Sequence, residues 1–322
     1  MSATRPSPRL VGDVGGTNAR FALIDKAGTI ARTRVLATED YPSLGAAMAA
    51  YLALEAPAEP PCAAAVAVAS PVTGDTVSFT NHPWSFSIAA LQHELGLERL
   101  LVVNDFAANA RALPHLQPDE RMVVGGGAPV AKLPLGALGP GTGLGVSALI
   151  WTGTGWAVIA GEGGHATMAA ADEREAAVLA RMRRHFDHVS AERVLSGPGL
   201  VNLYETLAEI EGVPAAPFTA AQIADQRLGE NEPLCREALA MFCAMLGTMA
   251  GNLALTLGAR GGIYIAGGIV PRLGARFAES GFRARFEAMG RFQPYLAAIP
   301  TYVVTTPIPA FLGLRALLDE TR

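Results

Sequence analysis

The sequence predicts an α/β protein of two lobes. With 322 residues, the chain is longer than a single compact domain usually is. Half of the residues are hydrophobic and 17% are charged, a composition typical of folded globular proteins. Similar glycine-rich strand–turn–strand patterns open each half of the chain, at residues 9–25 and 145–160. Two lobes are therefore expected. We assign residues 1–115 together with 306–322 to a smaller α/β domain and residues 116–305 to a larger α/β domain.

The first lobe is expected to begin as a β-meander and to continue with alternating helices and strands. Ser43 is a good N-cap, and a proline-rich stretch follows the helix that it begins. The last apolar strand ends on Asn104 and Asp105, and ligands of open α/β sheets tend to collect outside the carboxyl ends of strands. The expected strands cover residues 9–14, 19–25, 29–37, 63–69, 77–81 and 100–103, and the expected helices cover residues 43–54 and 88–95.

The second lobe contains a long apolar stretch at residues 238–257. Its length and composition would fit a membrane span, but Thr248 and Asn252 interrupt it, and Gly247 and Gly251 permit close helix packing. We interpret it as a buried central helix. The remaining predictions are loops and turns at 125–143, strands at 145–151, 156–160 and 262–266, and helices at 173–185, 199–210, after Gly268, and at 312–319.

Charge and cysteine usage exclude several classes of protein. The formal net charge is −4, and no run of Lys or Arg offers the basic surface that nucleic acid requires, so no nucleic-acid partner is expected. Cys62, Cys235 and Cys243 are odd in number and lack a CxxC spacing, which fits neither a disulfide framework nor a zinc cluster. Residues 1–8 are polar and contain proline, which is not the pattern of a signal peptide. We therefore expect a cytoplasmic protein that is not embedded in a membrane.

Three glycine-containing turns give the clearest sign of chemistry. Turns that expose several backbone N–H groups form nests for anions, and a missing side chain lets a phosphate approach closely. One such turn is a weak signal, but three together, with Asp and Thr among them, predict a polyphosphate ligand. The first comprises Gly12, Asp13, Val14, Gly15, Gly16 and Thr17, the second Gly141, Thr142, Gly143, Leu144 and Gly145, and the third Ala266, Gly267 and Gly268.

The surroundings of these turns exclude the two commonest nucleotide-binding loops. A Walker P-loop needs GxxxxGK[ST], and neither of the two lysines, Lys26 and Lys132, follows such a glycine run. A Rossmann fingerprint leads into a helix, whereas the first two turns lead into predicted strands. We therefore expect phosphate to be held at hairpins. Only the third turn is expected to precede a helix, whose N-terminal dipole would favour the negative charge of a nucleotide.

Asp13 points to a divalent cation. Its carboxylate would be repelled by bound phosphates unless a cation lay between them, and Mg²⁺ is commonly held by one or two carboxylates with waters and phosphates. We therefore expect Asp13 to bind Mg²⁺ directly or through water. The alternative is that Asp13 only caps its turn. The hydroxyls of Thr17 and Thr142 are candidate donors to phosphate oxygens.

A second group of residues is polar and suits a polyol. Carboxylates accept hydrogen bonds from two hydroxyls, Asn both donates and accepts, and His can do either. The group comprises Asn104, Asp105, Glu162, His165 and Glu192. Ordinary alternatives exist: Glu192 can be a charge on a helix face, His165 a hydrogen-bonded core histidine, and Asp105 the cap of the helix that follows it.

Seven segments resemble, in the same order, those of bacterial glucokinases of the actin-like, or ribonuclease H-like, ATPase superfamily. They span nearly the whole chain, which makes the resemblance much more specific than any single glycine turn. The segments are residues 11–20, 80–82, 103–106, 141–145, 161–165, 189–199 and 265–271. The resemblance implies a two-lobed α/β fold with mixed β-sheets, a cleft between the lobes, and a homodimer.

The resemblance also implies roles for named residues. Asp105 corresponds to the catalytic base, and residues 12–17 correspond to the ATP loop. The residues that correspond to glucose ligands are Asn104, Asp105, Glu162, His165 and Glu192. Related ROK kinases and repressors carry a cysteine-rich zinc motif after the corresponding histidine, but residues 166–171 contain no Cys, so zinc is not expected and a non-ROK glucokinase is favoured. Pro140 is a departure, because relatives carry a small residue before the second turn.

The resulting hypothesis is an ATP-dependent glucokinase. ATP and Mg²⁺ would lie between the lobes, and Asp105 would accept the proton of the C6 hydroxyl of glucose as that oxygen attacks the γ-phosphorus. A sugar-sensing repressor would need a DNA-binding module, for which too few residues precede the first strand. An actin-like or chaperone-like ATPase would not need the polar group. A kinase for mannose, fructose or an amino sugar is a third alternative.

Overall fold

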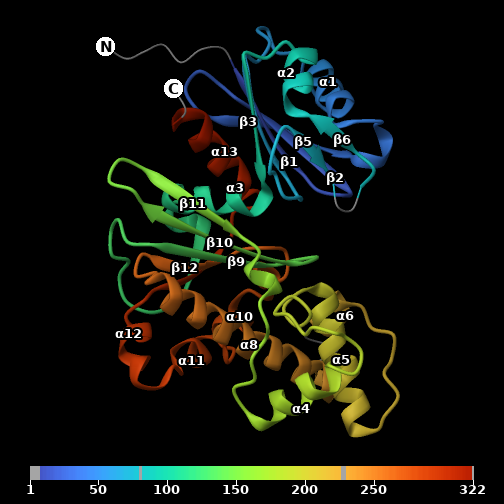
Figure 1. The fold of residues 1–322 in the computed structure, drawn as a ribbon, viewed down its shortest axis with the longest axis vertical. Coiled ribbons are helices and arrows are strands. Elements are labelled where there is room, and N and C mark those ends of the chain that lie inside the picture. Colours follow the sequence, from blue (N-terminus) through green and yellow to red (C-terminus); the bar gives the residue numbers. More distant parts are fainter. Residues whose placement is uncertain (1–7, 80–81, 226–229, 321–322) are drawn as a thin grey trace. The chain divides into compact units, whose positions relative to one another are not determined.

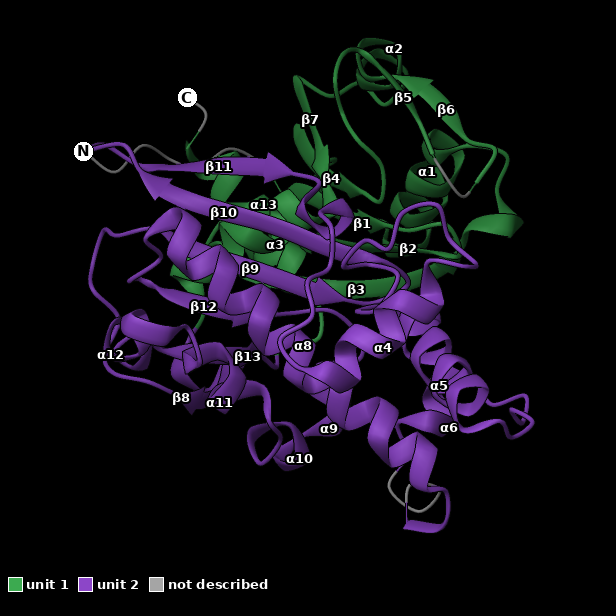
Figure 2. Cartoon of the chain, turned by 60° about the horizontal axis from the view of Figure 1, so that its bottom comes forward, with its two compact units in different colours: residues 1–116, 306–322 green, residues 117–305 purple. Residues whose placement is uncertain are grey.

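The chain folds into two compact units, each built around a mixed β-sheet. The structure is a computed structural model that describes residues 8–79, 82–225 and 230–320 (Figure 1). One unit comprises residues 1–116 and 306–322, and the other comprises residues 117–305 (Figure 2). The second unit is therefore inserted into the sequence of the first, ahead of the last helix of the chain.

A mixed sheet forms the middle of the first unit. Its strands are β1 (Arg9–Val14), β2 (Asn18–Ile24), β3 (Ile30–Ala37), β4 (Ala63–Val68) and β7 (Arg99–Asn104), in the order β3-β2-β1-β4-β7. The first three form the expected antiparallel meander, whereas β1, β4 and β7 run parallel. Their register aligns Val14, Val68 and Asn104. The carboxyl ends of the three parallel strands therefore meet at one edge of the sheet.

Helices flank this sheet: α1 (Leu44–Glu55), α2 (Ile88–Glu94), α3 (Asp105–Ala112) and α13 (Pro309–Glu320). Ser43 caps α1 as predicted, since its hydroxyl oxygen accepts a hydrogen bond from the backbone N–H of Ala46. α13 lies beside α3 (Figure 1), so closely that a Cβ atom on Gly313 would collide with the carbonyl oxygen of Ala108. The buried side chain of Phe311 joins the last helix to the core beneath the sheet.

A small hairpin lies outside the main sheet of the first unit. It consists of β5 (Thr76–Ser78) and β6 (Ser85–Ser87), of which only the first was expected. Thr80 and Asn81, which belong to the predicted strand at 77–81 and to the 80–82 segment of the resemblance, lie outside the described residues.

The sheet of the second unit is also mixed. Its strands are β8 (Arg121–Gly125), β9 (Leu135–Pro140), β10 (Leu144–Trp151), β11 (Trp156–Gly161), β12 (Gly262–Ile265) and β13 (Thr301–Val304), in the order β11-β10-β9-β12-β13-β8. β9, β12 and β13 run parallel, whereas β10 and β11 form an antiparallel hairpin. The carboxyl ends of β9 and β12 therefore lie side by side.

The prediction of loops and turns at residues 125–143 was wrong for β9, which is a buried strand near the middle of the sheet. The glycine content of this segment reflects close packing rather than a turn. A Cβ atom on Gly136 would come within 2.6 Å of the side chain of Ile263 on the neighbouring strand. β8 and β13, of five and four residues, were also not predicted.

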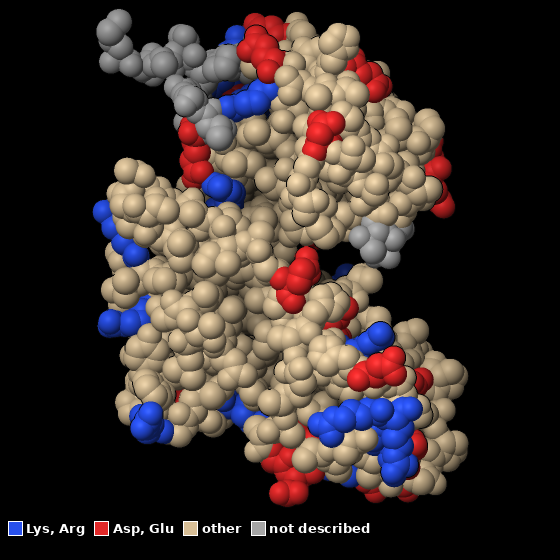
Figure 3. Space-filling model, viewed as in Figure 1, with Lys and Arg blue, Asp and Glu red and all other residues tan. Residues whose placement is uncertain are grey.

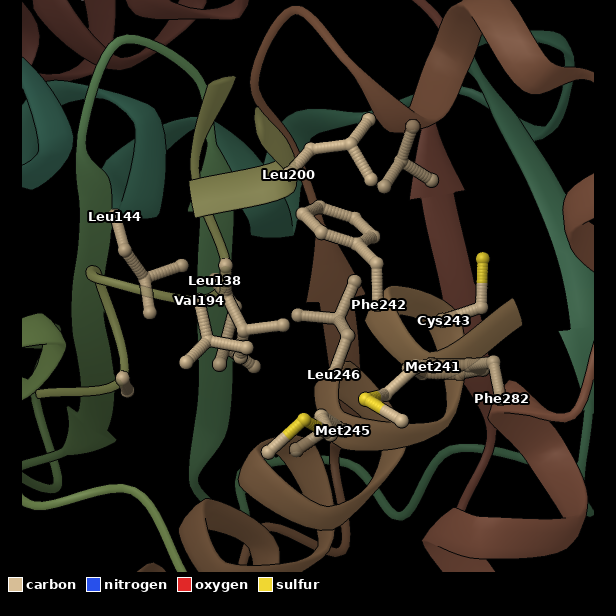
Figure 4. Close-up of a cluster of buried hydrophobic side chains, with 14 of the residues drawn as sticks. Leu138, Leu144, Val194, Leu200, Met241, Phe242, Cys243, Met245, Leu246 and Phe282 are labelled. Atoms are coloured by element: carbon tan, nitrogen blue, oxygen red, sulfur yellow. The ribbon is translucent and has the colours of Figure 1, made fainter. Parts of the chain in front are cut away.

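A long buried helix, α8 (Pro233–Leu257), runs through the second unit. It is long and apolar enough to cross a membrane by length and composition alone, but 61% of its most apolar window is buried inside the protein. Phe242 and Leu246 project from it into the hydrophobic cluster shown in Figure 4. A Cβ atom on Gly247 would collide with the carbonyl oxygen of Phe282 in α11 (Phe282–Glu287). The interpretation as a core helix with glycines at its contacts is confirmed.

Several helices begin earlier in the sequence than predicted, and each has a proline in its first turn. α5 (Gly197–Glu211), α8 and α13 contain Pro198, Pro233 and Pro309 at these positions. Proline is tolerated there because the first N–H groups of a helix have no partner within the helix, and its fixed backbone angle suits helix entry. The prolines mark helix starts and do not exclude these residues from the helices.

The other helices of the second unit are mostly short. They are α4 (Glu173–Met182), α6 (Ala220–Ile223), α9 (Val270–Leu273), α10 (Ala275–Ala278) and α12 (Gln293–Ala297). α4 ends before the predicted residue 185.

Near α4, basic and acidic side chains gather together in the view of Figure 3. Arg174 pairs with Glu237 and Glu211, and Arg181 pairs with Glu209. All three cysteines of the chain lie among the described residues and are free thiols.

Candidate active site

The first glycine turn connects β1 to β2 and is held by hydrogen bonds from two sides. Gly15 N–H donates to the carbonyl oxygen of Asn18 at 2.9 Å, and the hydroxyl of Thr38 donates to the carbonyl oxygen of Gly16 at 2.8 Å. Gly12 lies within β1, where a Cβ atom would come within 2.9 Å of the ring of Phe21. The turn therefore leads into a strand, as predicted, and its backbone is fixed before any ligand arrives.

Asp13 lies near the end of β1 and faces Arg20 across the hairpin. The two residues are directly paired in the strand register, and Arg20 Nη1 lies 3.4 Å from Asp13 Oδ2. Burial raises the pKa of the Asp13 carboxyl, and the positive charge of Arg20 opposes this shift. Sequence analysis did not single out Arg20. The signal that could have identified Arg20 is the predicted antiparallel hairpin, because a turn at residues 15–17 pairs Arg20 with Asp13.

Asn104 and Asp105 lie where β7 passes into α3, and their side chains hold that junction. Asn104 is the N-cap: its Oδ1 accepts hydrogen bonds from the backbone N–H groups of Phe106 at 2.9 Å and Ala107 at 3.2 Å. Its Nδ2 donates to the carbonyl oxygen of Ser70 at 3.4 Å. The alternative in which Asp105 is the helix cap is therefore wrong, since Asp105 is the first residue of the helix.

The carboxyl group of Asp105 has an unusual affinity for protons. Burial and, to a smaller extent, the negative charge of Asp13 raise its pKa to about 6. Hydrogen bonds from the backbone of Phe106 and Asp105 and from Asn104 oppose this rise. The influence of Asp13 on Asp105 shows that the first unit brings these two predicted site residues together at the carboxyl ends of its parallel strands.

The second glycine turn lies between β9 and β10 in the second unit. Gly141 N–H donates to the carbonyl oxygen of Gly143 at 2.8 Å, and the first N–H of α5, from Gly197, donates to the carbonyl oxygen of Gly141 at 2.8 Å. The side chain of Thr142 is exposed at the tip, as is that of Thr17 in the first turn. Leu144 N–H, just after the turn, donates to Oε2 of Glu192 at 2.9 Å.

The third glycine turn follows β12 and packs against the start of the second. Gly267 has a φ of +84°, and a Cβ atom on it would collide with the carbonyl oxygen of Pro140 at the end of β9. Ala266 N–H donates to the carbonyl oxygen of Leu138 at 2.7 Å. Gly268 is exposed, and a Cβ atom on it would have no neighbouring atom within 4 Å. The predicted helix after it is confirmed as the single turn of α9.

Glu162 and His165 lie in the segment that follows β11, and backbone bonds tie this segment to Glu192. His165 N–H donates to the carbonyl oxygen of Glu162 at 3.0 Å, and Glu192 N–H donates to that of Gly164 at 2.8 Å. His165 is exposed, so the alternative of a core histidine is wrong. It borders a cavity of about 380 Å³ whose other lining residues are His185, Phe186, Asp187, His188, Ser190 and Arg193.

The predicted residues thus form two clusters, one in each unit. The first unit gathers the first turn with Asp13, Asn104 and Asp105, and the second gathers the other two turns with Glu162, His165 and Glu192. Among the described residues, no group of three or more His, Cys, Asp or Glu side chains could hold a metal ion by itself. Any ion at Asp13 would need oxygen ligands from water or a bound phosphate as well.

The mixed sheets carry glycine turns and carboxylates at the ends of parallel strands. This arrangement is typical of α/β proteins that bind phosphates and polar small molecules. The chain belongs to the glucokinase family, whose model, described as Glucokinase, matches residues 10–321. The glucokinase of Paramagnetospirillum magneticum is 55% identical over 314 residues, which cover 97% of this chain and 98% of that protein. The predicted family is confirmed.

Solved structures agree with this assignment. The crystal structure of a glucokinase from an Antarctic psychrotroph matches with a TM-score of 0.90 and 37% identity, covering 98% of this chain and all of that one. A ROK family glucokinase from Streptomyces griseus, solved in complex with glucose and AMPPNP, matches with a TM-score of 0.65 and 17% identity, covering 97% and 99% of the two chains. The second match shows the fold alone. The fold is therefore that of an α/β sugar kinase with mixed sheets.

Proposed function

We propose that this chain uses Asp105 as the general base when it transfers the γ-phosphoryl group of ATP to the C6 hydroxyl of glucose. Its membership of the glucokinase family supports ATP-dependent phosphorylation of glucose. The observation that carries the role of Asp105 is its pKa, which burial and Asp13 raise to about 6. A general base is most effective when its pKa lies near the working pH, because it is then ionised yet still basic.

The proton and the phosphoryl group move in one step. Asp105 accepts the proton of the C6 hydroxyl as the hydroxyl oxygen bonds to the γ-phosphorus, and the bond from that phosphorus to the bridging oxygen of ADP breaks. Positioning of the reactants and stabilisation of the spreading negative charge provide most of the rate enhancement. The rigid junction of β7 and α3, with Asn104 as its cap, keeps the Asp105 carboxyl in place.

The three glycine turns are proposed to hold the phosphates through backbone N–H groups. These are residues Gly12, Asp13, Val14, Gly15, Gly16 and Thr17, then Gly141, Thr142 and Gly143, then Gly267 and Gly268. Asp13 is proposed to bind Mg²⁺, directly or through water, because its carboxylate would otherwise repel bound phosphates and its side chain is still 23% exposed. When bound, the ion would neutralise phosphate charge.

Five side chains are proposed to bind glucose hydroxyls: Asn104, Asp105, Glu162, His165 and Glu192. Oδ1 of Asn104 accepts two backbone hydrogen bonds and one N–H of its amide donates to Ser70, which leaves the second amide N–H to donate to the sugar. Glu162 and His165 are exposed and can each engage a hydroxyl.

We also propose that the chain belongs to the actin-like ATPase superfamily, as the resemblance of its seven segments implies, and lies outside the ROK group, since residues 166–171 contain no Cys. The two functional domains are proposed to be residues 1–115 with 306–322 and residues 116–305. A cytoplasmic homodimer is proposed as the working form. Light scattering of the purified protein tests the dimer, because a monomeric mass at micromolar concentration would contradict it.

The role of Asp105 is tested by Asp105→Asn, which keeps the size of the side chain but removes the base. Loss of a general base costs about 10²- to 10⁴-fold, so kcat should fall at least ~100-fold. A coupled assay with ATP, Mg²⁺ and glucose measures kcat, and circular dichroism checks the fold. Asp119→Asn, at an exposed aspartate of the second unit, is the matched control and should be normal. Near-normal turnover of Asp105→Asn would remove Asp105 from this role.

The acceptor is tested with the same assay across a panel of hexoses. Glucose should give the highest kcat/KM, ahead of mannose, fructose and glucosamine. The absence of turnover with every hexose would contradict the kinase activity, whereas a preference for another hexose would change only the acceptor.

A further inference from the structure

Glu192 lies at a junction of three segments in the second unit. Its backbone N–H donates to the carbonyl oxygen of Gly164, in the segment that carries Glu162 and His165. Its backbone carbonyl oxygen accepts a hydrogen bond at 2.8 Å from the hydroxyl of Ser196, the N-cap of α5. Its side-chain Oε2 accepts the N–H of Leu144 at 2.9 Å, directly after the second glycine turn. One residue thus connects the polar segment, the start of α5 and the turn.

The carboxylate of Glu192 also packs on the turn itself. A Cβ atom on Gly143 would come within 2.5 Å of Oε2 and 3.3 Å of the carboxyl carbon. Gly143 has no positive φ that would require glycine. The absence of a side chain at position 143 is therefore explained by the approach of the Glu192 carboxylate.

The carboxylate is only partly used by these contacts. Oε2 is engaged by Leu144, whereas Oε1 accepts no hydrogen bond from the described part of the chain. A carboxylate can accept several hydrogen bonds at once. Glu192 can therefore hold the turn with one oxygen while the other is available to a sugar hydroxyl.

We propose that Glu192 is a positioning residue for the phosphate-binding turn at Gly141–Gly143 as well as a sugar ligand, and that it couples nucleotide affinity to sugar affinity. This inference rests on the proposed function. Loss of the Glu192 carboxylate leaves the N–H of Leu144 without its acceptor. A hydrogen bond to a carboxylate is about twice as strong as a neutral one, so this loss loosens the turn. A sugar that fixes Glu192 also fixes the turn, and linkage requires the nucleotide to favour the sugar by the same factor.

The first test separates this role from simple sugar binding. Calorimetry measures the Kd of Mg²⁺ and ADP in the absence of sugar for the wild type, Glu192→Ala and Glu162→Ala. Glu192→Ala should raise the Kd roughly tenfold, the effect of losing one charge-assisted hydrogen bond. Glu162→Ala is the matched control, because its side chain makes no contact with the turn among the interactions of the described residues. It should raise the glucose KM but leave the Kd for ADP unchanged.

Glu192→Gln distinguishes positioning from a loss of fold. The amide oxygen can still accept the N–H of Leu144, so this variant should recover most of the affinity for ADP. An equal loss of ADP affinity in Glu192→Gln and Glu192→Ala, with normal melting temperatures, would contradict the hydrogen bond as the cause. An unchanged Kd in Glu192→Ala would overturn the proposal.

A double-mutant cycle tests the contact between Glu192 and Gly143. Gly143→Ala should weaken ADP binding in the wild-type background, because the new methyl group displaces the carboxylate. The same change should cost much less in the Glu192→Ala background. Equal costs in the two backgrounds would overturn the contact.

The proposal and the proposed function fail in different ways. If the wild type binds ADP but phosphorylates no hexose, the function fails and the ADP measurements still decide the role of Glu192. If the wild type phosphorylates glucose and Glu192→Ala binds ADP normally, only the positioning role fails. A wild type that binds no ADP would overturn both.

Discussion

Two effects act in the same direction on the carboxyl group of Asp105. Burial removes water that would stabilise the ionised form, and the negative charge of Asp13 disfavours a second charge nearby. The hydrogen bonds from Phe106 and Asn104 favour the ionised form but do not overcome these effects. The pKa of about 6 is therefore a property of the place where β7 meets α3, and not of aspartate as such.

This pKa predicts how activity depends on pH. In its proposed role as base, Asp105 acts only when it is ionised, so kcat/KM should be constant well above pH 6 and fall tenfold per pH unit well below it. The pH profile of kcat/KM reports the pKa of the free enzyme, and its acidic midpoint should lie near 6. An acidic midpoint near 4, the ordinary value for aspartate, would contradict this prediction.

The source of the shift is tested without any assay of activity. In Asp13→Asn the neighbouring negative charge is absent, so the pKa of Asp105 should be lower than in the wild type. An NMR titration of labelled aspartate carboxyl groups measures this directly. A pKa of Asp105 that stays the same would mean that burial alone causes the shift.

At the scale of the element, α3 depends on the side chain that precedes it. Asn104 Oδ1 accepts hydrogen bonds from two backbone N–H groups that have no carbonyl partner within the helix. Asn104→Ala should therefore lower the free energy of unfolding by about 1 kcal/mol, whereas Asn104→Ser, which retains a capping oxygen, should lower it less. Urea denaturation measures both values. Equal losses in the two variants would show that capping is not the contribution of Asn104.

Helix α8 shows how tertiary packing can outweigh helix propensity. Replacing a glycine within a helix by alanine gains about 1 kcal/mol of intrinsic preference. At Gly247 the added methyl group would meet the carbonyl oxygen of Phe282, and overpacking of this kind costs about 1–3 kcal/mol. Since backbone can yield less than a flexible side chain, we expect Gly247→Ala to destabilise the protein.

The matched control for Gly247→Ala is Gly281→Ala at the same helix contact. There a Cβ atom would meet that of Ala244 at 3.9 Å, an ordinary distance. Thermal melting compares the two variants. A melting temperature of Gly247→Ala at or above that of Gly281→Ala would be evidence against the close contact of α8 and α11.

At the scale of the whole molecule, the residues proposed to bind sugar and nucleotide belong to folded elements of the two units. A ligand that binds only the folded chain stabilises it, by about 2.7 kcal/mol at a concentration 100 times its Kd. Glucose should therefore raise the melting temperature, and L-glucose should not. No shift at saturating glucose, or an equal shift with L-glucose, would contradict a specific glucose site.

Sequence alone determined the local features of this protein. The strands around the first turn, the cap at Ser43 and the buried character of α8 all follow from patterns within a short stretch of chain. The glycine turns at Gly15 and Gly143 were identified because their composition is unusual. The seven segments that identified the glucokinase family are likewise local, and the family was confirmed.

Only the tertiary structure decided what depends on partners distant in sequence. β9 reads as a loop because its Gly136 makes room for Ile263, more than one hundred residues away in the sequence. The pKa of Asp105 depends on Asp13, which the parallel pairing of β1, β4 and β7 brings near. The contact of Glu192 with Gly143 is of the same kind. A sequence records which side chains are present, but burial, charge and close approach arise only when separate segments pack together.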